Sequence, residues 1–152
     1  MYLQRAIELS KEGMERGDGG PFGAVIVQNG EIIAEGNNRV LVDNDPTAHA
    51  EVVAIRRATS KLGRFDLSDC ELYTSCEPCP MCLGAIYWAR PKAVYYANTK
   101  ADAAAIEFDD SFIYDELEKP MEARAIPFHH IDSPAARGIF EAWAEKSDKT
   151  QY

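Results

Sequence analysis

The sequence feature that most constrains the fold is a cluster of three cysteines, Cys76, Cys79 and Cys82, in the segment TSCEPCPMC. Cys79 and Cys82 are three positions apart, so at the start of a helix their side chains share one face. Two thiolates on one face can bind a single metal ion, and the helix N-terminus stabilises their negative charge. A disulfide framework would instead spread its cysteines through a small secreted chain. The cluster therefore indicates metal or redox chemistry.

A second segment, TAHAEVVAI, places His49 and Glu51 near the start of an otherwise apolar helix. If the starts of the two helices abut across the sheet, His49 supplies a third metal ligand. Zinc accepts one histidine and two cysteines, and water can take the fourth position. Zinc lowers the pKa of such a water molecule from about 15.7 to about 7. Glu51 is then placed to accept its proton and pass it to a substrate.

Other interpretations of these residues stay open at this point. A strand followed by Cys-x-x-Cys at a helix start is also typical of a thioredoxin-like redox site, which would leave His49 and Glu51 without a role. A closed structural zinc site would use Cys76 as a fourth ligand. A histidine in an apolar helix is also commonly a core residue. The sequence suggests no role for Cys70.

Hydrophobic periodicity and turn residues predict one domain of alternating strands and helices. Asn29-Gly30 lies between two short apolar runs and suits the type I′ turn of a β-hairpin. Asp45 or Thr47 is expected to cap the second helix. The apolar run 93–97 predicts a strand covered on both faces. The predicted elements are helices over 2–16, 48–62, 79–89 and 135–147, a hairpin within 21–36, and strands over 70–74 and 93–97. This pattern predicts an α/β sandwich with a mixed sheet.

Beyond residue 100 the pattern is less regular. The segment ADAAAIEFDDSFIYDELEK predicts short helical pieces, and ARAIPFHHI predicts an edge strand, because Pro127 excludes a central one. His129 and His130 are expected at the surface. Residues 1–152 are expected to form a single domain, in which residues 135–152 are a C-terminal helix and tail.

Charge and hydropathy limit the partners of the chain. Its net charge is −9, whereas nucleic-acid binders need positive charge to displace phosphate counterions. A small substrate is therefore expected, and no nucleic acid. No apolar stretch is long enough to cross a membrane. The first segment, MYLQRAIELSKEGMERG, is amphipathic and carries acids, unlike a signal or transit peptide. We expect a cytoplasmic protein with no membrane partner.

The segments HAE and PCPMC together resemble the signature of the cytidine-deaminase-like superfamily of zinc deaminases. The resemblance implies one zinc ion per chain, with His49, Cys79 and Cys82 as ligands. It makes Glu51 the residue that moves protons. It also implies a three-layer α/β/α sandwich whose mixed five-stranded sheet has the order 2-1-3-4-5. Cys76 lies outside the matched pattern and is expected to be a small buried residue.

Longer segments narrow the resemblance to the bacterial guanine deaminases, and FDDSFIY discriminates best because the metal motifs are shared across the superfamily. The resemblance implies hydrolysis of the 2-amino group of guanine to xanthine and ammonia. It also implies a homodimer in which the C-terminal segment covers the pocket and is sometimes exchanged between subunits. Deamination of another free base or of transfer-RNA adenosine is the alternative. The segments that carry the resemblance are GGPFGAVIV, NDPTAHAEV, LYTSCEPCPMCLGAIYWARPKAVYYA and FDDSFIYDE.

Further side chains are candidates for binding a purine base. The resemblance supports Asn38 as a partner of the imidazole side of the base, and Asp110 as an acceptor on its amino edge that also assists proton transfer. Phe22 is a candidate for stacking on the purine, and Trp88 for lining the pocket. Tyr152 is carried over as a lid residue. Structural roles stay open for all of them. Asn38 could be a turn residue, and Asp110 could face solvent behind a helix cap. Phe22 and Trp88 could be core residues, and Tyr152 could belong to a free terminus.

Overall fold

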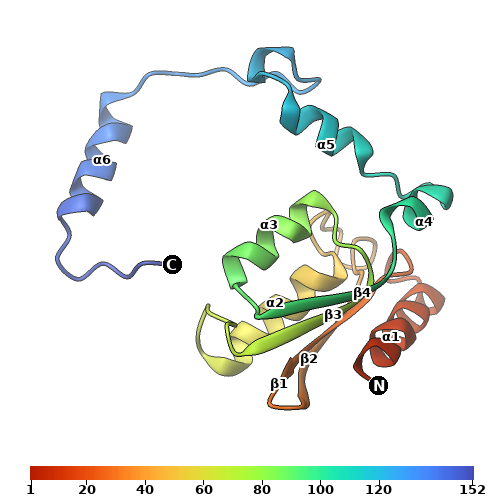
Figure 1. Cartoon of the computed structure of the whole chain (residues 1–152). Coiled ribbons are helices and arrows are strands. Elements are labelled where there is room, and N and C mark those ends of the chain that lie inside the picture. Colours follow the sequence, from red (N-terminus) through yellow and green to blue (C-terminus); the bar gives the residue numbers. More distant parts are fainter. The chain divides into compact units, whose positions relative to one another are not determined.

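The computed structural model describes residues 1–152 and divides into two compact units, Met1–Ser111 and Phe112–Tyr152 (Figure 1). The first unit is built on one sheet with the strand order β2-β1-β3-β4. β1 is antiparallel to β2 and to β3, while β3 and β4 are parallel, so the sheet is mixed as predicted. The elements of this unit are α1 (Tyr2–Arg16), β1 (Gly23–Gln28), β2 (Glu31–Asn37), α2 (Ala50–Leu62), β3 (Cys70–Cys76), α3 (Pro80–Ala89), β4 (Ala93–Asn98) and α4 (Lys100–Ala105).

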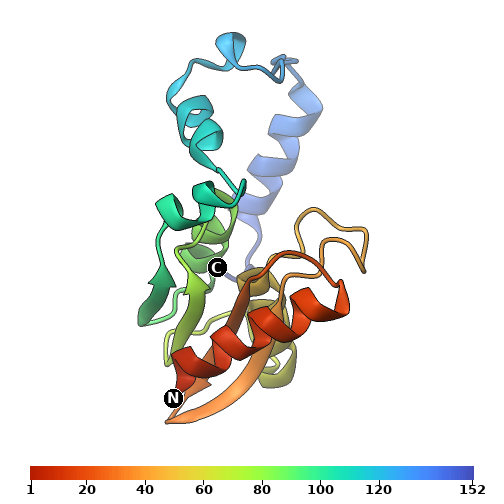
Figure 2. The same ribbon diagram turned by 90° about the vertical axis from the view of Figure 1, so that its right-hand side faces the viewer.

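The sheet lies between two layers of helix, with α2 and α3 on one side and α1 on the other (Figure 1); α1 lies in front of the sheet in Figure 2. Side chains on β1 alternate between the two faces because a strand has a period of two residues. Val25 and Val27 pack with Leu9 of α1, whereas Ala24 and Ile26 face the core on the side of α2 and α3. β1 is therefore buried on both faces, and it anchors the three-layer sandwich that was predicted.

The turns of the first unit form where the sequence predicts them. α1 ends at Gly17, whose φ of 78° is a left-handed conformation that glycine adopts at little cost. Asn29 and Gly30 both have positive φ, 50° and 79°, which is the pattern of a type I′ hairpin turn. The predicted first helix and hairpin are both confirmed.

The expected fifth strand is wrong, since the sheet has four strands. Residues 123–131, expected as an edge strand, contain no strand. Pro127 has no N–H to give to a ladder. Nearby backbone groups are bonded locally: the N–H of Ala125 donates to the carboxylate of Glu116 at 2.7 Å, and Nε of Arg124 donates to the carbonyl of Glu116 at 3.0 Å. These bonds hold the segment against its own preceding helix instead of a neighbouring strand.

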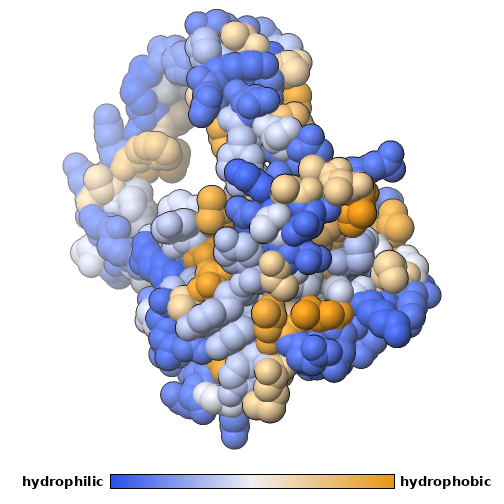
Figure 3. All heavy atoms as spheres, turned by 45° about the vertical axis from the view of Figure 1, so that its right-hand side comes forward, coloured by the Kyte–Doolittle hydropathy of each residue, from blue (hydrophilic) through white to orange (hydrophobic).

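Strand β4 differs from the prediction in its burial. The run AVYYA was expected to be covered on both faces, but β4 is an edge strand and Tyr95 and Tyr96 are about half exposed, 45% and 50%. On one face Tyr95 stacks on Tyr73 with ring centroids 4.6 Å apart. Apolar side chains are exposed elsewhere on the surface too (Figure 3).

The second unit has helices but no buried residue. α5 (Ser111–Glu118) begins at the boundary between the units, η1 (Met121–Ala123) is a short 3₁₀ turn, and α6 (Pro134–Glu145) confirms the predicted final helix. His129 and His130 are exposed, as expected. No helix of the chain combines the length and the apolar character that a membrane span requires.

Close packing between β2 and α2 predicts the effect of a single methyl group. A Cβ added at Gly36 would lie 2.5 Å from the carbonyl oxygen of Ala50, which is backbone and cannot move aside. We expect Gly36→Ala to lower the free energy of unfolding by about 1–3 kcal/mol through overpacking. Urea denaturation followed by circular dichroism measures the change.

Gly84, inside α3, provides the matched control because nothing lies within 4 Å of an added Cβ. Gly84→Ala should leave stability unchanged or raise it by up to ~1 kcal/mol, since alanine favours helix. Equal stabilities of the two variants would contradict the packing described here.

Candidate metal centre

His49 and Cys79 occupy equivalent positions at the starts of two helices. His49 is the N-cap of α2 and Cys79 is the N-cap of α3, each with extended backbone and no side-chain capping bond. Pro80 follows at the first helical position of α3, where its fixed φ suits a helix start. The expectation that Asp45 or Thr47 caps α2 is wrong: the carboxylate of Asp45 bonds instead to the N–H and hydroxyl of Thr47. The side chain of His49 is therefore free of backbone bonds and points toward α3.

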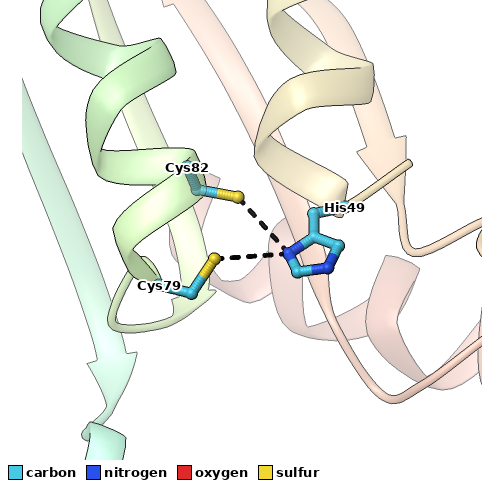
Figure 4. Close-up of side chains that lie close together, drawn as sticks. All are labelled: His49, Cys79 and Cys82. Carbon is cyan, nitrogen blue, oxygen red and sulfur yellow. Dashed lines mark hydrogen bonds between the residues drawn. The ribbon is translucent and has the colours of Figure 1, made fainter. Parts of the chain in front are cut away.

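The three predicted ligands meet between these helix starts (Figure 4). Nδ1 of His49 lies 3.4 Å from Sγ of Cys79 and 3.5 Å from Sγ of Cys82. All three ligand atoms lie within 4.8 Å of one another. Tetrahedral zinc bonded to sulfur at about 2.3 Å and to nitrogen at about 2.05 Å separates those two ligands by about 3.6 Å. The three side chains could therefore hold a metal ion, and their spacing fits zinc.

Cys76 is not part of this group. Its thiol is buried, as predicted, and lies 3.8 Å from the carbonyl oxygen of Thr99. The metal-ligand group contains three residues, so the closed four-ligand site finds no support. All four cysteines are free thiols, and the contacts of His49 with both Cys79 and Cys82 give the histidine a place that a simple dithiol site does not need.

The thiols of the centre are strongly polarised. The pKa of Cys79 falls to about 4, first because the thiol of Cys82 donates a hydrogen bond to it and next because of its contact with His49. The same hydrogen bond to Cys79 is the main reason why the pKa of Cys82 rises. The bond with Cys79 also raises the pKa of His49. Cysteine binds metals as the thiolate, so a metal ion bound here would displace the protons of its ligand thiols.

Glu51 faces the same site from the first turn of α2. It is 6% exposed, and burial is the main reason why its pKa is raised. One carboxylate oxygen, Oε2, lies 3.3 Å from Sγ of Cys82, and Oε1 lies 3.1 Å from the hydroxyl of Thr74. Thr74 has a single hydroxyl proton and also lies 3.2 Å from the carbonyl oxygen of Cys76. A buried carboxyl group with a raised pKa, beside metal ligands, is suited to taking up and releasing protons.

Two candidates for base binding lie at the same end of β1. Asn38, which follows β2, is buried, and its N–H donates to the carbonyl oxygen of Phe22 at 3.0 Å. The ring of Phe22 packs edge-on against that of Phe108, with centroids 5.0 Å apart. Phe108 was missed by the sequence analysis, and its position just before Asp109-Asp110 was the available signal. Phe22 also packs against the core, so the structural and the binding roles are compatible.

The remaining candidates differ in their surroundings. Asp109 accepts a bond from the N–H of Ser111 at 2.8 Å, at the start of α5. Asp110 is half-buried; burial raises its pKa, and the negative charge of Cys79 raises it further. Trp88 is 65% exposed and is not a core residue. Tyr152 belongs to the second unit and is exposed, and its lid role stays a prediction.

Comparison with known proteins gives consistent matches. The family model of the cytidine and deoxycytidylate deaminase zinc-binding region matches residues 1–98. The guanine deaminase of Bacillus subtilis is 60% identical over 99% of this chain and 97% of its own. The crystal structure of guanine deaminase from Bacillus subtilis superimposes with a TM-score of 0.96, at 60% identity over 99% of this chain and 96% of that one. A tRNA-specific adenosine deaminase of Aquifex aeolicus is 42% identical over 95% of this chain and 93% of its own.

The three-ligand centre predicts how single cysteine substitutions change zinc content. We expect Cys79→Ser to lower zinc affinity by at least ~100-fold, because loss of a ligand exceeds the 10–100-fold cost of losing an outer hydrogen-bond partner. Cys76→Ser should retain about one zinc ion per chain, since its thiol lies outside the group. Elemental analysis after dialysis against a weak chelator measures both. Loss of zinc from Cys76→Ser as complete as from Cys79→Ser would favour the closed site.

Proposed function

The chain belongs to the cytidine and deoxycytidylate deaminase zinc-binding family, and we propose that its reaction is the hydrolysis of guanine to xanthine and ammonia. The observation that carries this substrate is the 60% identity with the Bacillus subtilis guanine deaminase over 99% of the chain. The centre formed by His49, Cys79 and Cys82 supports a single zinc ion as the cofactor. Zinc, when bound, supplies an activated water molecule for the hydrolysis.

Glu51 moves the protons in this proposal. The oxygen of water forms a bond to carbon 2 of guanine, and the bond from that carbon to the amino nitrogen breaks. Glu51 takes one proton from the water at a carboxylate oxygen and delivers it to the adjacent ring nitrogen. It then takes the second proton from the hydroxyl group now on carbon 2 and delivers it to the amine, which leaves as ammonia while the C–O bond becomes the carbonyl of xanthine. Its burial and raised pKa support the role, because a carboxyl group that accepts and returns protons works best with a pKa near the working pH.

Asn38 binds the imidazole side of the base. Its Oδ1 accepts a bond from the N–H of Val40 at 3.1 Å. A backbone N–H can donate only to the oxygen of the amide, so this bond fixes the orientation of the side chain and leaves Nδ2 to donate to a ligand. Guanine presents two acceptors on that side, N7 and O6. The donor of Asn38 therefore complements the base.

Three further side chains complete the proposed pocket. Asp110 accepts hydrogen bonds from the amino edge of guanine and assists the proton transfers, which its half-buried position and nearness to Cys79 support. Phe22, supported by Phe108, stacks on the purine. Trp88 lines the pocket from α3 with its exposed indole ring. A flat apolar slot with a few polar groups at its edges is the usual design of a site for a small aromatic ligand.

Deamination of transfer-RNA adenosine is the second candidate, favoured by the 42% identity with the Aquifex aeolicus enzyme. Binding of transfer RNA requires positive charge around the site. The net charge of −9 opposes it, and the higher identity with the guanine deaminase points the same way. Free guanine is therefore the substrate that we propose.

We also propose that the protein is a cytoplasmic homodimer. The second unit has no buried residue, although α6 carries Ile139, Phe140 and Trp143 on its surface. A short helix with exposed apolar side chains gains stability by packing against another surface. The proposed surface is a second copy of the chain, so that residues 135–152 cover the partner's active site with Tyr152 as part of the lid. The four free thiols support a reducing compartment.

The role of Glu51 predicts a loss of turnover without a loss of metal. We expect Glu51→Gln to lower the rate of xanthine formation by about 10²–10⁴-fold, the usual contribution of general acid–base catalysis. Zinc content should stay near one per chain. Glu71→Gln is the matched control, because Glu71 lies on the neighbouring strand β3 but bonds to Tyr73 rather than to the metal ligands. Unchanged deamination by Glu51→Gln would contradict the proton-transfer role.

The exchanged tail predicts that two inactive variants restore each other. Glu51→Gln lacks the proton carrier but has an intact tail, and Tyr152→Ala has an intact centre but an altered tail. After co-refolding, about half of the dimers are mixed and each has one complete site, so about a quarter of the wild-type activity should return. Xanthine formation and light scattering measure activity and dimer mass. No recovery from mixed dimers would show that each tail covers its own site.

A further inference from the structure

Asp18 is a buried carboxylate that the proposed mechanism does not use. It is 7% exposed and follows the end of α1. Its Oδ2 accepts hydrogen bonds from Arg16, with Nε at 3.1 Å and Nη2 at 2.9 Å, and from Nδ2 of Asn37 at 3.0 Å. Nη1 of Arg39 lies 3.9 Å from the same oxygen. Hydrogen bonds to a charged group are stronger than neutral ones, so Asp18 joins the end of α1 firmly to the end of β2.

The backbone of Asp18 holds the loop after β2 as well. Its carbonyl oxygen accepts hydrogen bonds from the N–H groups of Leu41 and Val42, at 3.0 and 3.1 Å. The same loop is bonded on its other side to the residue before His49, since the N–H of Arg39 donates to the carbonyl oxygen of Ala48 at 2.9 Å. The loop is thus fixed between Asp18 and the start of α2.

Asn38 lies within this loop, at the end that Asp18 and Asn37 hold. The amide of Asn37 uses one hydrogen for Asp18 and donates also to the carbonyl oxygen of Asn38, at 3.1 Å. Gly19, next to Asp18, touches the other side: an added Cβ there would lie 2.1 Å from Oδ1 of Asn38. The backbone carbonyl of Asn38 is therefore bonded to Asn37, which Asp18 holds, and its side-chain oxygen packs closely against Gly19, the residue after Asp18.

We propose that Asp18 is a positioning residue for substrate binding: it holds Asn37 and the following loop so that Nδ2 of Asn38 meets the purine base. The inference rests on the proposed function, in which Asn38 binds guanine. Asp18 itself touches no substrate in this role. A displacement of about 1 Å at a binding group lowers catalytic efficiency by about 100-fold. Loss of the hydrogen bonds of the Asp18 carboxylate should therefore lower kcat/KM measurably.

A double-mutant cycle on zinc-loaded protein separates positioning from general structural support. Asp18→Ala should lower kcat/KM for guanine by about 10- to 100-fold, with most of the change in KM. In the Asn38→Ala background, Asp18→Ala should cost no more than about twofold, because the group that it positions is already absent. A merely structural role would cause the same loss in both backgrounds.

Binding provides a readout without turnover. Hypoxanthine keeps N7 and O6 but has no 2-amino group to hydrolyse, so calorimetry can measure its Kd directly. The Kd should rise by the same factor as KM in Asp18→Ala. Asp18→Asn keeps an oxygen that can accept from Asn37 and should show an intermediate loss. If Asp18→Ala does not fold, Asp18→Asn carries the same cycle.

Glu35→Gln is the matched control. Glu35 also accepts two hydrogen bonds from an arginine, Arg5, at 2.7 and 2.9 Å, and joins α1 to β2 away from Asn38. It should change kcat/KM by less than about twofold. Additive losses for Asp18 and Asn38, in a wild-type protein that deaminates guanine, would overturn the positioning role alone. Absence of guanine turnover by wild-type protein would contradict the proposed function on which the inference rests.

Discussion

The contact of His49 with Cys79 and Cys82 depends on two helices that begin at the same end of one sheet. Each helix start leaves a side chain free of backbone bonds, and these side chains meet at the distances that zinc requires. The layers of the fold produce this arrangement. β1 is buried on both faces, and α2 and α3 pack on one face of the sheet. The metal centre is therefore a direct consequence of the packing of α2 and α3.

Much of this could be predicted from the sequence because the signals are local. Periodicity and turn residues defined the first helix, the hairpin and the three later helices, and the motif HAE with PCPMC defined the ligand group. The family resemblance is confirmed by the match to residues 1–98 and by the full-length similarity to a guanine deaminase. Spacing within one helix start is enough to predict that Cys79 and Cys82 share a face, whereas the approach of His49 depended on the topology of the sheet.

The predictions failed where the actual partner of a group, rather than its residue type, decides the outcome. Asp45 and Thr47 are good capping residues by type, but they bond to each other, and His49 takes the N-cap position. Residues 123–131 have strand-like composition, yet Glu116 binds the backbone beside Pro127 and no strand forms. Tyr95 and Tyr96 are about half exposed, although their apolar run predicted a strand covered on both faces. Propensity contains none of this information, because each case depends on which groups bond or pack together in the folded chain.

Asp18 illustrates why binding sites extend beyond the groups that touch a ligand. In the sequence it is one acid in a glycine-rich turn, and only the fold brings it to Asn37. The direction of Nδ2 in Asn38 is set by the hydrogen bond from the N–H of Val40 to Oδ1. The loop that contains Asn38 and Val40 is held by the carbonyl oxygen of Asp18 on one side and by that of Ala48 on the other. Because Ala48 precedes His49, one loop relates the proposed base-binding amide to the metal ligands. In the proposed site, Asn38 and the metal ligand His49 are thus connected by covalent and hydrogen bonds within a single loop.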